Sequence, residues 1–174
     1  MGKDFDVGSP FIMEHITGFK PIANQSATIL ILGSMPSEAS LLKRQYYAHP
    51  RNQFWLIIAR VFSKDIQMSY RAKTTLLKES GIALWDVIAS CKRKGSLDAH
   101  IKEVSVNDIP KLLKRYKNIR AIFCNGKTAF NMFEKKFKSI GLPVVCLPST
   151  SPANTKPIEW KLKQWNRITL NSSA

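Results

Sequence analysis

The sequence predicts a single α/β domain, with a three-layer αβα arrangement around a central four-stranded parallel sheet. Short apolar runs alternate along the chain with amphipathic segments, which is the pattern of strands joined by crossover helices. The length of 174 residues suits one domain, and 44% hydrophobic with 22% charged residues is typical of a folded protein. We assign residues 1–15 to an N-terminal arm, 16–170 to the domain and 171–174 to a frayed tail.

Four apolar runs are the predicted strands. The first, Ala-Thr-Ile-Leu-Ile-Leu-Gly at 27–33, is continuous and β-branched, as expected of a strand buried on both faces of a parallel sheet. Residues 82–88, 119–124 and 142–147 form similar runs. The polar, lysine-rich stretch at 90–105 is interpreted as a connection, and the chain before the first run has little periodicity.

Five segments with helical spacing of apolar residues are the predicted helices. Asn107 is expected to cap the third of them, and Pro157 to stand in the first turn of the last. The helices are expected at 52–62, 70–80, 107–116, 127–140 and 157–167.

Positive charge is in large excess. Lys and Arg number 27 against 12 Asp and Glu, which gives a formal net charge of +15. Such an excess either keeps the surface solvated or attracts a polyanion. Nucleic acid is the first candidate, because cationic side chains displace its condensed counterions. Composition alone leaves both interpretations open.

The sequence also bears on compartment and metal content. No run approaches the roughly 18 apolar residues of a membrane span, and the N-terminus lacks the pattern of a signal peptide. Cys91, Cys124 and Cys146 are widely spaced, with no CxxC and no Cys/His cluster. We therefore expect a cytoplasmic protein with no membrane partner, structural metal or disulfide framework.

In open α/β sheets the ligand crevice lies outside the carboxyl ends of the strands, so the residues after each run are the candidate site. Gly-Ser-Met-Pro-Ser at 33–37 and Tyr-Tyr-Ala-His-Pro-Arg-Asn-Gln-Phe-Trp at 46–55 follow the first strand. Neither matches GxxxxGK[ST] or GxGxxG, which disfavours a nucleotide cofactor. Asn52 is either a helix cap or, among these aromatic residues, an amide that binds the edge of a planar base.

Polar residues follow the later strands as well. Asn125, before Gly and Lys, either forms a tight turn or aims its amide into the pocket. Residues 147–154, Leu-Pro-Ser-Thr-Ser-Pro-Ala-Asn, make a rigid loop with hydroxyl donors for phosphate. There is no GxSxG elbow and no Cys or Ser partner for His49, and Glu38 and Asp86 are the only carboxylates near strand ends. These absences disfavour esterase, two-carboxylate glycosidase and two-metal nuclease chemistry.

At these motifs the sequence resembles the uracil-DNA glycosylase superfamily, and more closely its hypoxanthine (deoxyinosine)-DNA glycosylase branch, family six. The resemblance covers about residues 16–168 and keeps the motifs in the expected order. Ser34-Met35 stand where other branches often carry Asp or Asn, so the resemblance moves the catalytic role to Asn52 and disfavours uracil as substrate. The motifs are LGSMPSEASL at 32–41, QYYAHPRNQFW at 45–55, GIALWDVIASC at 81–91, CNGK at 124–127 and LPSTSPAN at 147–154.

The resemblance implies a uracil-DNA-glycosylase-like fold and a repair enzyme that flips out hypoxanthine and hydrolyses its N-glycosidic bond. It implies no cofactor and no metal, and a monomer acting at the nucleoid. No lysine is clearly placed to form a Schiff base, so no strand cleavage is expected. The implied partner is double-stranded DNA that contains a damaged base, and whether single-stranded DNA is also bound is left open. The 152–154 end of the loop would fill the gap left by the flipped base. The base pocket would comprise Gly33, Ser34, Met35, Tyr47, His49, Phe54 and Asn125. The DNA contacts would be Arg51, Lys127, Ser149, Thr150, Ser151, Pro152 and Asn154.

Three alternatives remain open. They are a glycosylase for uracil or for G:T/U mismatches, a non-catalytic DNA-binding module of the same fold, and an enzyme acting on free deoxyinosine phosphates. If DNA is the partner, Lys and Arg should gather where the first and last strands end, near Arg51, Lys127 and Lys156. An even spread of charge would instead indicate a role in solubility.

Overall fold

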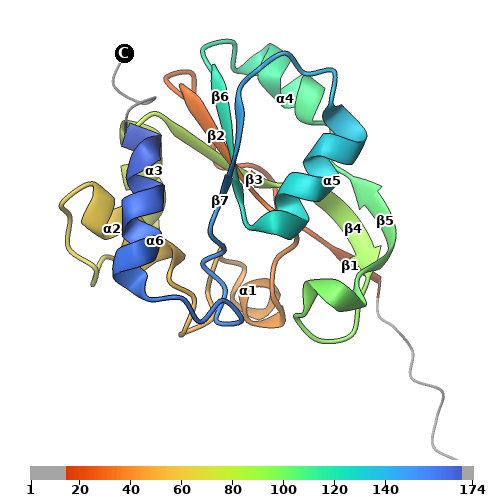
Figure 1. The fold of residues 1–174 in the computed structure, drawn as a ribbon, viewed down its shortest axis with the longest axis horizontal. Helices are drawn as coiled ribbons and strands as arrows, with labels where there is room; N and C mark the ends of the chain where they lie inside the picture. The colour runs from red at the N-terminus through yellow and green to blue at the C-terminus, as the bar shows by residue number, and fades with distance from the viewer. Residues whose placement is uncertain (1–14, 170–174) are drawn as a thin grey trace, which may run out of the picture.

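Four parallel strands form the central sheet of the protein, seen here in a computed structural model that describes residues 15–169 (Figure 1). Their order is β3-β2-β6-β7, and every neighbouring pair is parallel. The predicted α/β class and four-stranded parallel sheet are therefore confirmed. Residues 1–14 and 170–174, which include the predicted tail and nearly all of the predicted arm, lie outside the described residues. The strands are β2 (Ile29–Gly33), β3 (Ile82–Asp86), β6 (Ala121–Asn125) and β7 (Val144–Leu147).

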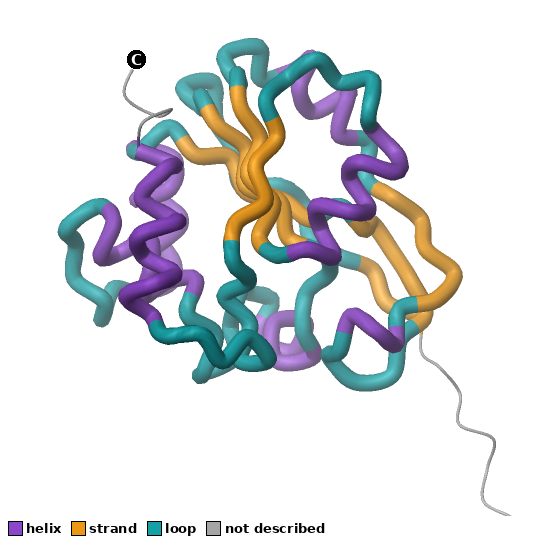
Figure 2. The backbone as a smooth tube through the Cα atoms, viewed as in Figure 1, coloured by secondary structure: helices purple, strands orange, loops and turns teal. Residues whose placement is uncertain are grey.

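Helices cover both faces of this sheet because its strands are apolar on both sides. Ile29 and Ile31 of β2 pack into one core cluster, and Leu30 and Leu32 pack into another on the opposite face. Figures 1 and 2 show the two helical layers on either side of the sheet. The first layer contains α2 (Phe54–Val61), α3 (Tyr70–Glu79) and α6 (Ile158–Trp165), and the second contains α4 (Ile109–Arg115) and α5 (Lys127–Phe137).

A second, antiparallel sheet was not predicted. It has three strands in the order β1-β4-β5 and uses much of the stretch at 90–105, so the prediction of a plain connection there is wrong. The last of these strands is exposed at every position but one, so no alternation of apolar and polar residues marks it. The strands are β1 (His15–Thr17), β4 (Ile88–Lys92) and β5 (Lys102–Val106).

Val87 separates the two sheets and divides the apolar run predicted as one strand. Its N–H donates to the carbonyl of Gly33 at 2.8 Å, and its carbonyl accepts from the N–H of Asn107 at 2.9 Å. The Asn107 side chain donates to the carbonyls on either side of Val87, at 2.8 and 3.2 Å. Asn107 therefore does not cap α4 as predicted; Asp108 does, accepting from the N–H of Lys111 at 3.0 Å.

A short helix after β2, α1 (Glu38–Lys43), was also missed. Ser37 caps it by accepting from the N–H of Ser40 at 3.2 Å, and Arg44 ends it in the left-handed conformation, φ 53°. Pro157 precedes α6 instead of occupying its first turn. The remaining elements within residues 15–169 are two 3₁₀ turns, η1 (Asp98–His100) and η2 (Asn166–Ile168).

The carboxyl ends of the parallel strands point to the lower edge in Figure 1. There α1, the loop after β7 and the β4–β5 connection come together. Within residues 15–169, no helix has the length and apolar character to cross a membrane.

Candidate active site

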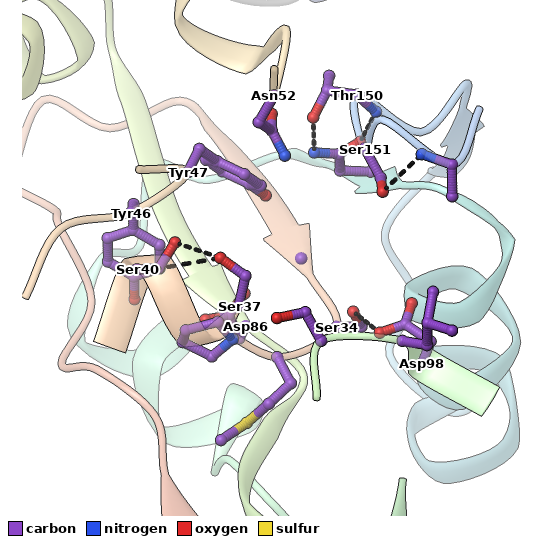
Figure 3. A pocket seen from close by; sticks show the side chains of 17 residues that line it. Ser34, Ser37, Ser40, Tyr46, Tyr47, Asn52, Asp86, Asp98, Thr150 and Ser151 are labelled. Atoms are coloured by element: carbon purple, nitrogen blue, oxygen red, sulfur yellow. Dashed lines mark hydrogen bonds between the residues drawn. The ribbon is translucent and has the colours of Figure 1, made fainter. Parts of the chain in front are cut away.

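A pocket of about 130 Å³ lies at the carboxyl edge of the central sheet (Figure 3). This volume is well below the roughly 300–1,000 Å³ of pockets for drug-sized ligands, so it suits a small ring system. The ends of β2, β3 and β6, the chain between α1 and α2, and the loop after β7 all contribute to its walls. It is lined by six of the eight residues predicted for catalysis and the base pocket, and also by Thr150 and Ser151, which were predicted to contact DNA. The six are Gly33, Ser34, Met35, Tyr47, Asn52 and Asn125.

Asn52 directs the two ends of its side-chain amide to different surroundings. Oδ1 accepts from the backbone N–H of Phe54, the first residue of α2, at 3.0 Å. Nδ2 is turned toward the pocket (Figure 3). Asn52 can therefore act both as a helix cap and as a ligand-binding amide. Its oxygen bonds the first turn of α2, and its amino group remains as a donor for a ligand.

Tyr47 lines the pocket from a strained backbone position. Its φ of 54° is left-handed, which costs a non-glycine residue about 1 kcal/mol or more. Hydrogen bonds to both neighbours fix this conformation. The N–H of Tyr46 donates to the Tyr70 hydroxyl at 3.0 Å, the Trp55 indole donates to the Tyr46 carbonyl at 2.8 Å, and the N–H of Ala48 donates to a hydroxyl of α1 at 3.1 Å. The buried Tyr47 Oη makes no hydrogen bond of normal geometry among the described residues, although the Asn125 amide lies near enough to act on its pKa, which it lowers.

Phe54 and His49 lie outside the pocket, contrary to the prediction. Phe54 is fully buried and stacks against Tyr47 with ring centroids 4.0 Å apart. As the first residue of α2 it faces the core between helix and sheet, so it supports the ring that lines the pocket. His49 lies beside a neighbouring groove, where its Nδ1 accepts from the N–H of Arg51 at 3.1 Å.

Asp86 ends β3 with its carboxyl group in the pocket wall. The residue is 3% exposed, and Oδ2 has no hydrogen-bond partner among the described residues. A Cβ on Gly33 would lie 2.3 Å from Asp86 Oδ1 and 2.8 Å from the Tyr47 hydroxyl, so this close approach requires glycine. Burial and the charge of Asp98 raise the pKa of Asp86 to about 7, although Arg93 lowers it. A perturbed carboxyl in a pocket is a functional candidate.

In the sequence, Asp86 is recognisable as a lone carboxylate at the end of an otherwise apolar strand, but no function was assigned to it there. Its counter-charge, Arg93, gave no such signal. Arg93 is 3% exposed and donates from Nη2 to the carbonyl of Pro36, while Nε and Nη1 have no partner within residues 15–169. Arg93 therefore supports the segment after β2 and favours the ionised form of Asp86.

Asn125 and Thr150 join β6 to the loop after β7 through two hydrogen bonds. Asn125 Nδ2 donates to Thr150 Oγ1 and Oδ1 accepts from the Thr150 N–H, both at 2.9 Å. Thr150 is completely buried and lines the pocket, so it offers no exposed hydroxyl to a phosphate, and its predicted contact with DNA stays a prediction. Gly126 has φ +97°, and a Cβ there would meet Ser149 at 2.9 Å. The tight-turn interpretation of this motif therefore has direct structural support.

A buried lysine ties the same loop to the Asn52 segment. Lys161 of α6 is 1% exposed, and its Nζ donates to Gln53 Oε1 and to the Asn154 carbonyl, both at 2.7 Å. The N–H of Gln53 in turn donates to the Thr150 carbonyl at 3.0 Å. Burial lowers the pKa of Lys161. The sequence gives no sign of this role, because lysine in a polar helix is normally exposed.

The other residues predicted to bind DNA lie on two surfaces separated by the loop after β7. The first is a groove of about 340 Å³ beside the pocket, which Leu97 also lines. The second is a cleft between α5 and α6. Arg51, Ser151 and Pro152 line the groove, and Lys127, Ser149 and Asn154 line the cleft.

Positive charge occupies both edges of the sheet. As expected, the three basic residues named for the carboxyl edge are exposed there. A second group lies at the opposite edge, because α5 begins where β6 ends and α4 leads into β6. The charge therefore gathers only partly around the pocket. The carboxyl-edge residues are Arg51, Lys127 and Lys156, and the opposite group contains Lys114, Arg115, Lys135 and Lys136.

The protein is an α/β protein with an αβα fold, a small polar pocket at the strand ends and cationic grooves beside the pocket. This arrangement suits the binding of a flat polar group that is carried on a polyanion. The family model of the uracil DNA glycosylase superfamily matches residues 20–171. The chain belongs to this superfamily, which confirms the resemblance seen in the motifs.

Relatives extend the match over most of the fold. A protein from Methanosarcina barkeri named hypoxanthine DNA glycosylase is 34% identical over 149 residues, which are 85% of this chain and 94% of that protein. One of the same name from Methanosarcina acetivorans is 34% identical over 152 residues, 87% and 96% of the two chains. A solution NMR structure of a candidate uracil DNA glycosylase from Methanosarcina acetivorans has a TM-score of 0.82 and 31% identity, and the match covers 92% of this chain and 100% of that one.

Proposed function

We propose that the protein is a DNA glycosylase that removes hypoxanthine, the deamination product of adenine, and leaves an abasic site. The pocket itself carries the proposal: Tyr47 Oη and Asp86 Oδ2 are buried without partners in the wall that also holds Asn52. Unpaired buried polar groups cost free energy until a ligand satisfies them, so this wall favours a polar, planar ligand. The names of the two Methanosarcina relatives agree with this substrate.

Recognition of the base follows from the donors and acceptors in the pocket. Hypoxanthine presents a carbonyl oxygen beside an N–H group on its pairing edge. The Tyr47 hydroxyl is the donor for that carbonyl, and the ionised Asp86 carboxylate accepts from the N–H. Adenine presents an amino donor and a ring-nitrogen acceptor at the same positions, which leaves both protein groups unsatisfied and disfavours the normal base.

Asn52 acts on the leaving base. Because its oxygen is bonded to the N–H of Phe54, its amino group is the donor available to negative charge on the base as the C1′–N9 bond breaks. A water molecule supplies the oxygen that bonds C1′, and the proton released goes to the base. The products are free hypoxanthine and an abasic site. A neutral amide is a weak base, so orientation and electrostatic stabilisation, with the DNA phosphates included, supply most of the rate.

Base flipping requires a group that fills the space left in the duplex. Unstacking costs a few kcal/mol, and proteins commonly insert an apolar wedge at such a step. The sequence assigned this role to residues 152–154, but Leu97 is better suited. It is apolar, 56% exposed, and lines both the pocket and the groove at its side. Its loop is tied to the pocket, since Ser34 Oγ donates to Asp98 Oδ1 and the N–H of Glu38 donates to a serine hydroxyl of the loop, both at 2.9 Å.

Uracil is the second candidate substrate. Its pairing edge carries the same adjacent carbonyl and N–H groups, so Tyr47 and Asp86 can satisfy it in the same way. The small pocket volume also accommodates a pyrimidine. We expect double-stranded DNA to be the main substrate and the protein to act as a monomer at the nucleoid.

The test is a panel of duplexes that carry hypoxanthine, uracil, xanthine or ethenoadenine, incubated with the protein and then cleaved with hot alkali. We expect cleavage at hypoxanthine. Asn52→Ala should slow single-turnover excision about 100- to 1,000-fold while DNA binding persists. Excision of uracil without hypoxanthine would select the second candidate. Binding without excision of any base would instead identify a DNA-binding module.

A further inference from the structure

A second cleft lies behind the loop that forms one wall of the base pocket. Its volume is about 680 Å³, within the range of ligand-binding sites. The beginning of α5, the end of β7, the loop after β7 and one face of α6 enclose it. Ala153 lines both this cleft and the base pocket, so the two cavities are neighbours across a single loop.

Trp160 is the unusual side chain of this cleft. It is 45% exposed, whereas Trp55 and Trp165 are buried. The indole N–H groups of Trp55, Trp85 and Trp165 each donate to a backbone carbonyl, but that of Trp160 has no partner among the described residues. Gln164, one helical turn further along α6, lies on the same face. An exposed indole beside an amide provides a stacking surface together with hydrogen-bonding groups.

The charge of the cleft is entirely positive. Lys127, at the beginning of α5, and Lys156, just before α6, both line it and are exposed, and no carboxylate is found among the described residues that line it. Glu159, which precedes Trp160, lies instead 3.9 Å from Arg60 of α2. Two cations and an aromatic face are the elements that bind single-stranded nucleic acid, where the base stacks and the phosphate is held electrostatically.

We infer that the cleft binds the nucleotide next to the flipped one on the same strand, as an unstacked base against Trp160 with its phosphate between Lys127 and Lys156. The inference rests on the proposed function. It follows from the shared loop, because a strand that delivers one nucleotide into the base pocket passes over Ala153 to the neighbouring cavity. A base can enter the cleft only after leaving its own pair, so the cleft favours single-stranded or locally opened DNA.

Binding to single-stranded DNA that carries a stable abasic-site analogue tests the stacking. This probe does not depend on excision. Trp160→Ala should weaken binding on the order of tenfold, and Trp160→Phe should retain most of it. Val104→Ala, which shortens an exposed apolar side chain on β5, is the control and should bind like the unchanged protein. If Trp160→Ala binds the probe as tightly as the unchanged protein does, the inference is overturned. The cleft then either binds no ligand or binds a protein partner.

Cys146 provides a second, independent readout. It lines the cleft and is half-buried, whereas Cys91 and Cys124 are buried. The single-stranded probe at saturation should slow alkylation of Cys146 by a maleimide several-fold, measured by mass spectrometry of the labelled peptide. An unchanged rate of labelling overturns the inference. A third outcome separates the two proposals: Trp160→Ala loses affinity, but the unchanged protein excises no base. That result would overturn the proposed function and would still support DNA binding in the cleft.

Discussion

Asp86 and Tyr47 differ in how their charge responds to pH. Burial and the charge of Asp98 raise the pKa of Asp86 to about 7, so its carboxyl group titrates near neutrality. Burial, together with the Asp86 charge, raises the pKa of Tyr47 above its ordinary value, so its hydroxyl keeps its proton throughout this range. The pocket thus combines a constant donor with an acceptor whose charge depends on pH. Recognition of an N–H group by Asp86 is strongest when the carboxylate is ionised.

We therefore expect hypoxanthine excision to increase with pH through about 7. Asp86→Asn should flatten this profile, because the amide does not titrate. At pH 8 it should be about 10- to 100-fold slower than the unchanged protein, the equivalent of a lost hydrogen bond to a charged group. This difference should shrink about tenfold by pH 6, where only about a tenth of the Asp86 carboxyl groups stay ionised. Single-turnover rates from pH 6 to 8.5 measure this. Asp65→Asn, at an exposed carboxylate, should keep the increase; parallel profiles for Asp86→Asn and the unchanged protein would contradict the assignment.

Burial determines which elements the sequence revealed. Every residue of β2 is buried, so an unbroken apolar run identified it and its parallel neighbours. Nearly all of β5 is exposed, and α1 has only six residues, so neither leaves a clear pattern. The positions of the site loops were predictable because they follow buried strands. The direction of each side chain was not, since the rotation of α2 turns Phe54 into the core and the hydrogen bonds with Asn125 turn Thr150 inward.

The β4–β5 connection contains the proposed wedge. Leu97→Ala should slow excision from duplex DNA about tenfold, because the gap left by the flipped base is no longer filled. Excision from a single strand should be unchanged, since no stack has to be opened there. Leu42→Ala is the matched control: Leu42 of α1 is 86% exposed and lines neither the pocket nor the groove. An equal loss on both kinds of DNA would assign Leu97 to the pocket instead.

Helix α6 holds the site together through Lys161. Lys161→Met removes two hydrogen bonds from a charged group, so we expect the free energy of unfolding to fall by about 2 kcal/mol. Excision should slow as well, because the Asn52 segment and the loop after β7 are no longer joined. Urea unfolding and single-turnover rates measure the two effects. Lys163→Met, at an exposed position of the same helix, should change neither, and a Lys161→Met protein as stable as Lys163→Met would show that the link is dispensable.

The whole molecule offers DNA a continuous path along one edge of its sheet. The groove with Arg51, the base pocket and the cleft with Trp160 follow one another around the loop after β7. Basic residues at the opposite edge line none of these cavities, so they contribute long-range attraction and solubility. This division explains why the net charge of +15 is larger than the positive charge that lines the site.

The stability of the whole protein should depend on pH through Asp86. Its folded-state pKa of about 7 lies above the ordinary value of 3.8 for an aspartate, so the folded protein holds this proton more tightly than the unfolded chain. The contribution of Asp86 to stability is therefore most favourable at low pH, falls as pH rises from about 4 to 7, and is constant above that. Asp86→Asn lacks this loss. Between pH 4.5 and pH 8, its free energy of unfolding should rise by about 3 kcal/mol relative to that of the unchanged protein.

Urea denaturation at those two pH values measures the difference directly, because all other titrating groups are common to both proteins and cancel. The comparison needs no DNA, so it tests the environment of Asp86 independently of the reaction. Asp65→Asn should follow the unchanged protein at both pH values. If Asp86→Asn also follows the unchanged protein at both pH values, the Asp86 carboxyl group is already ionised at pH 4.5. Arg93 would then offset the cost of burying the carboxylate.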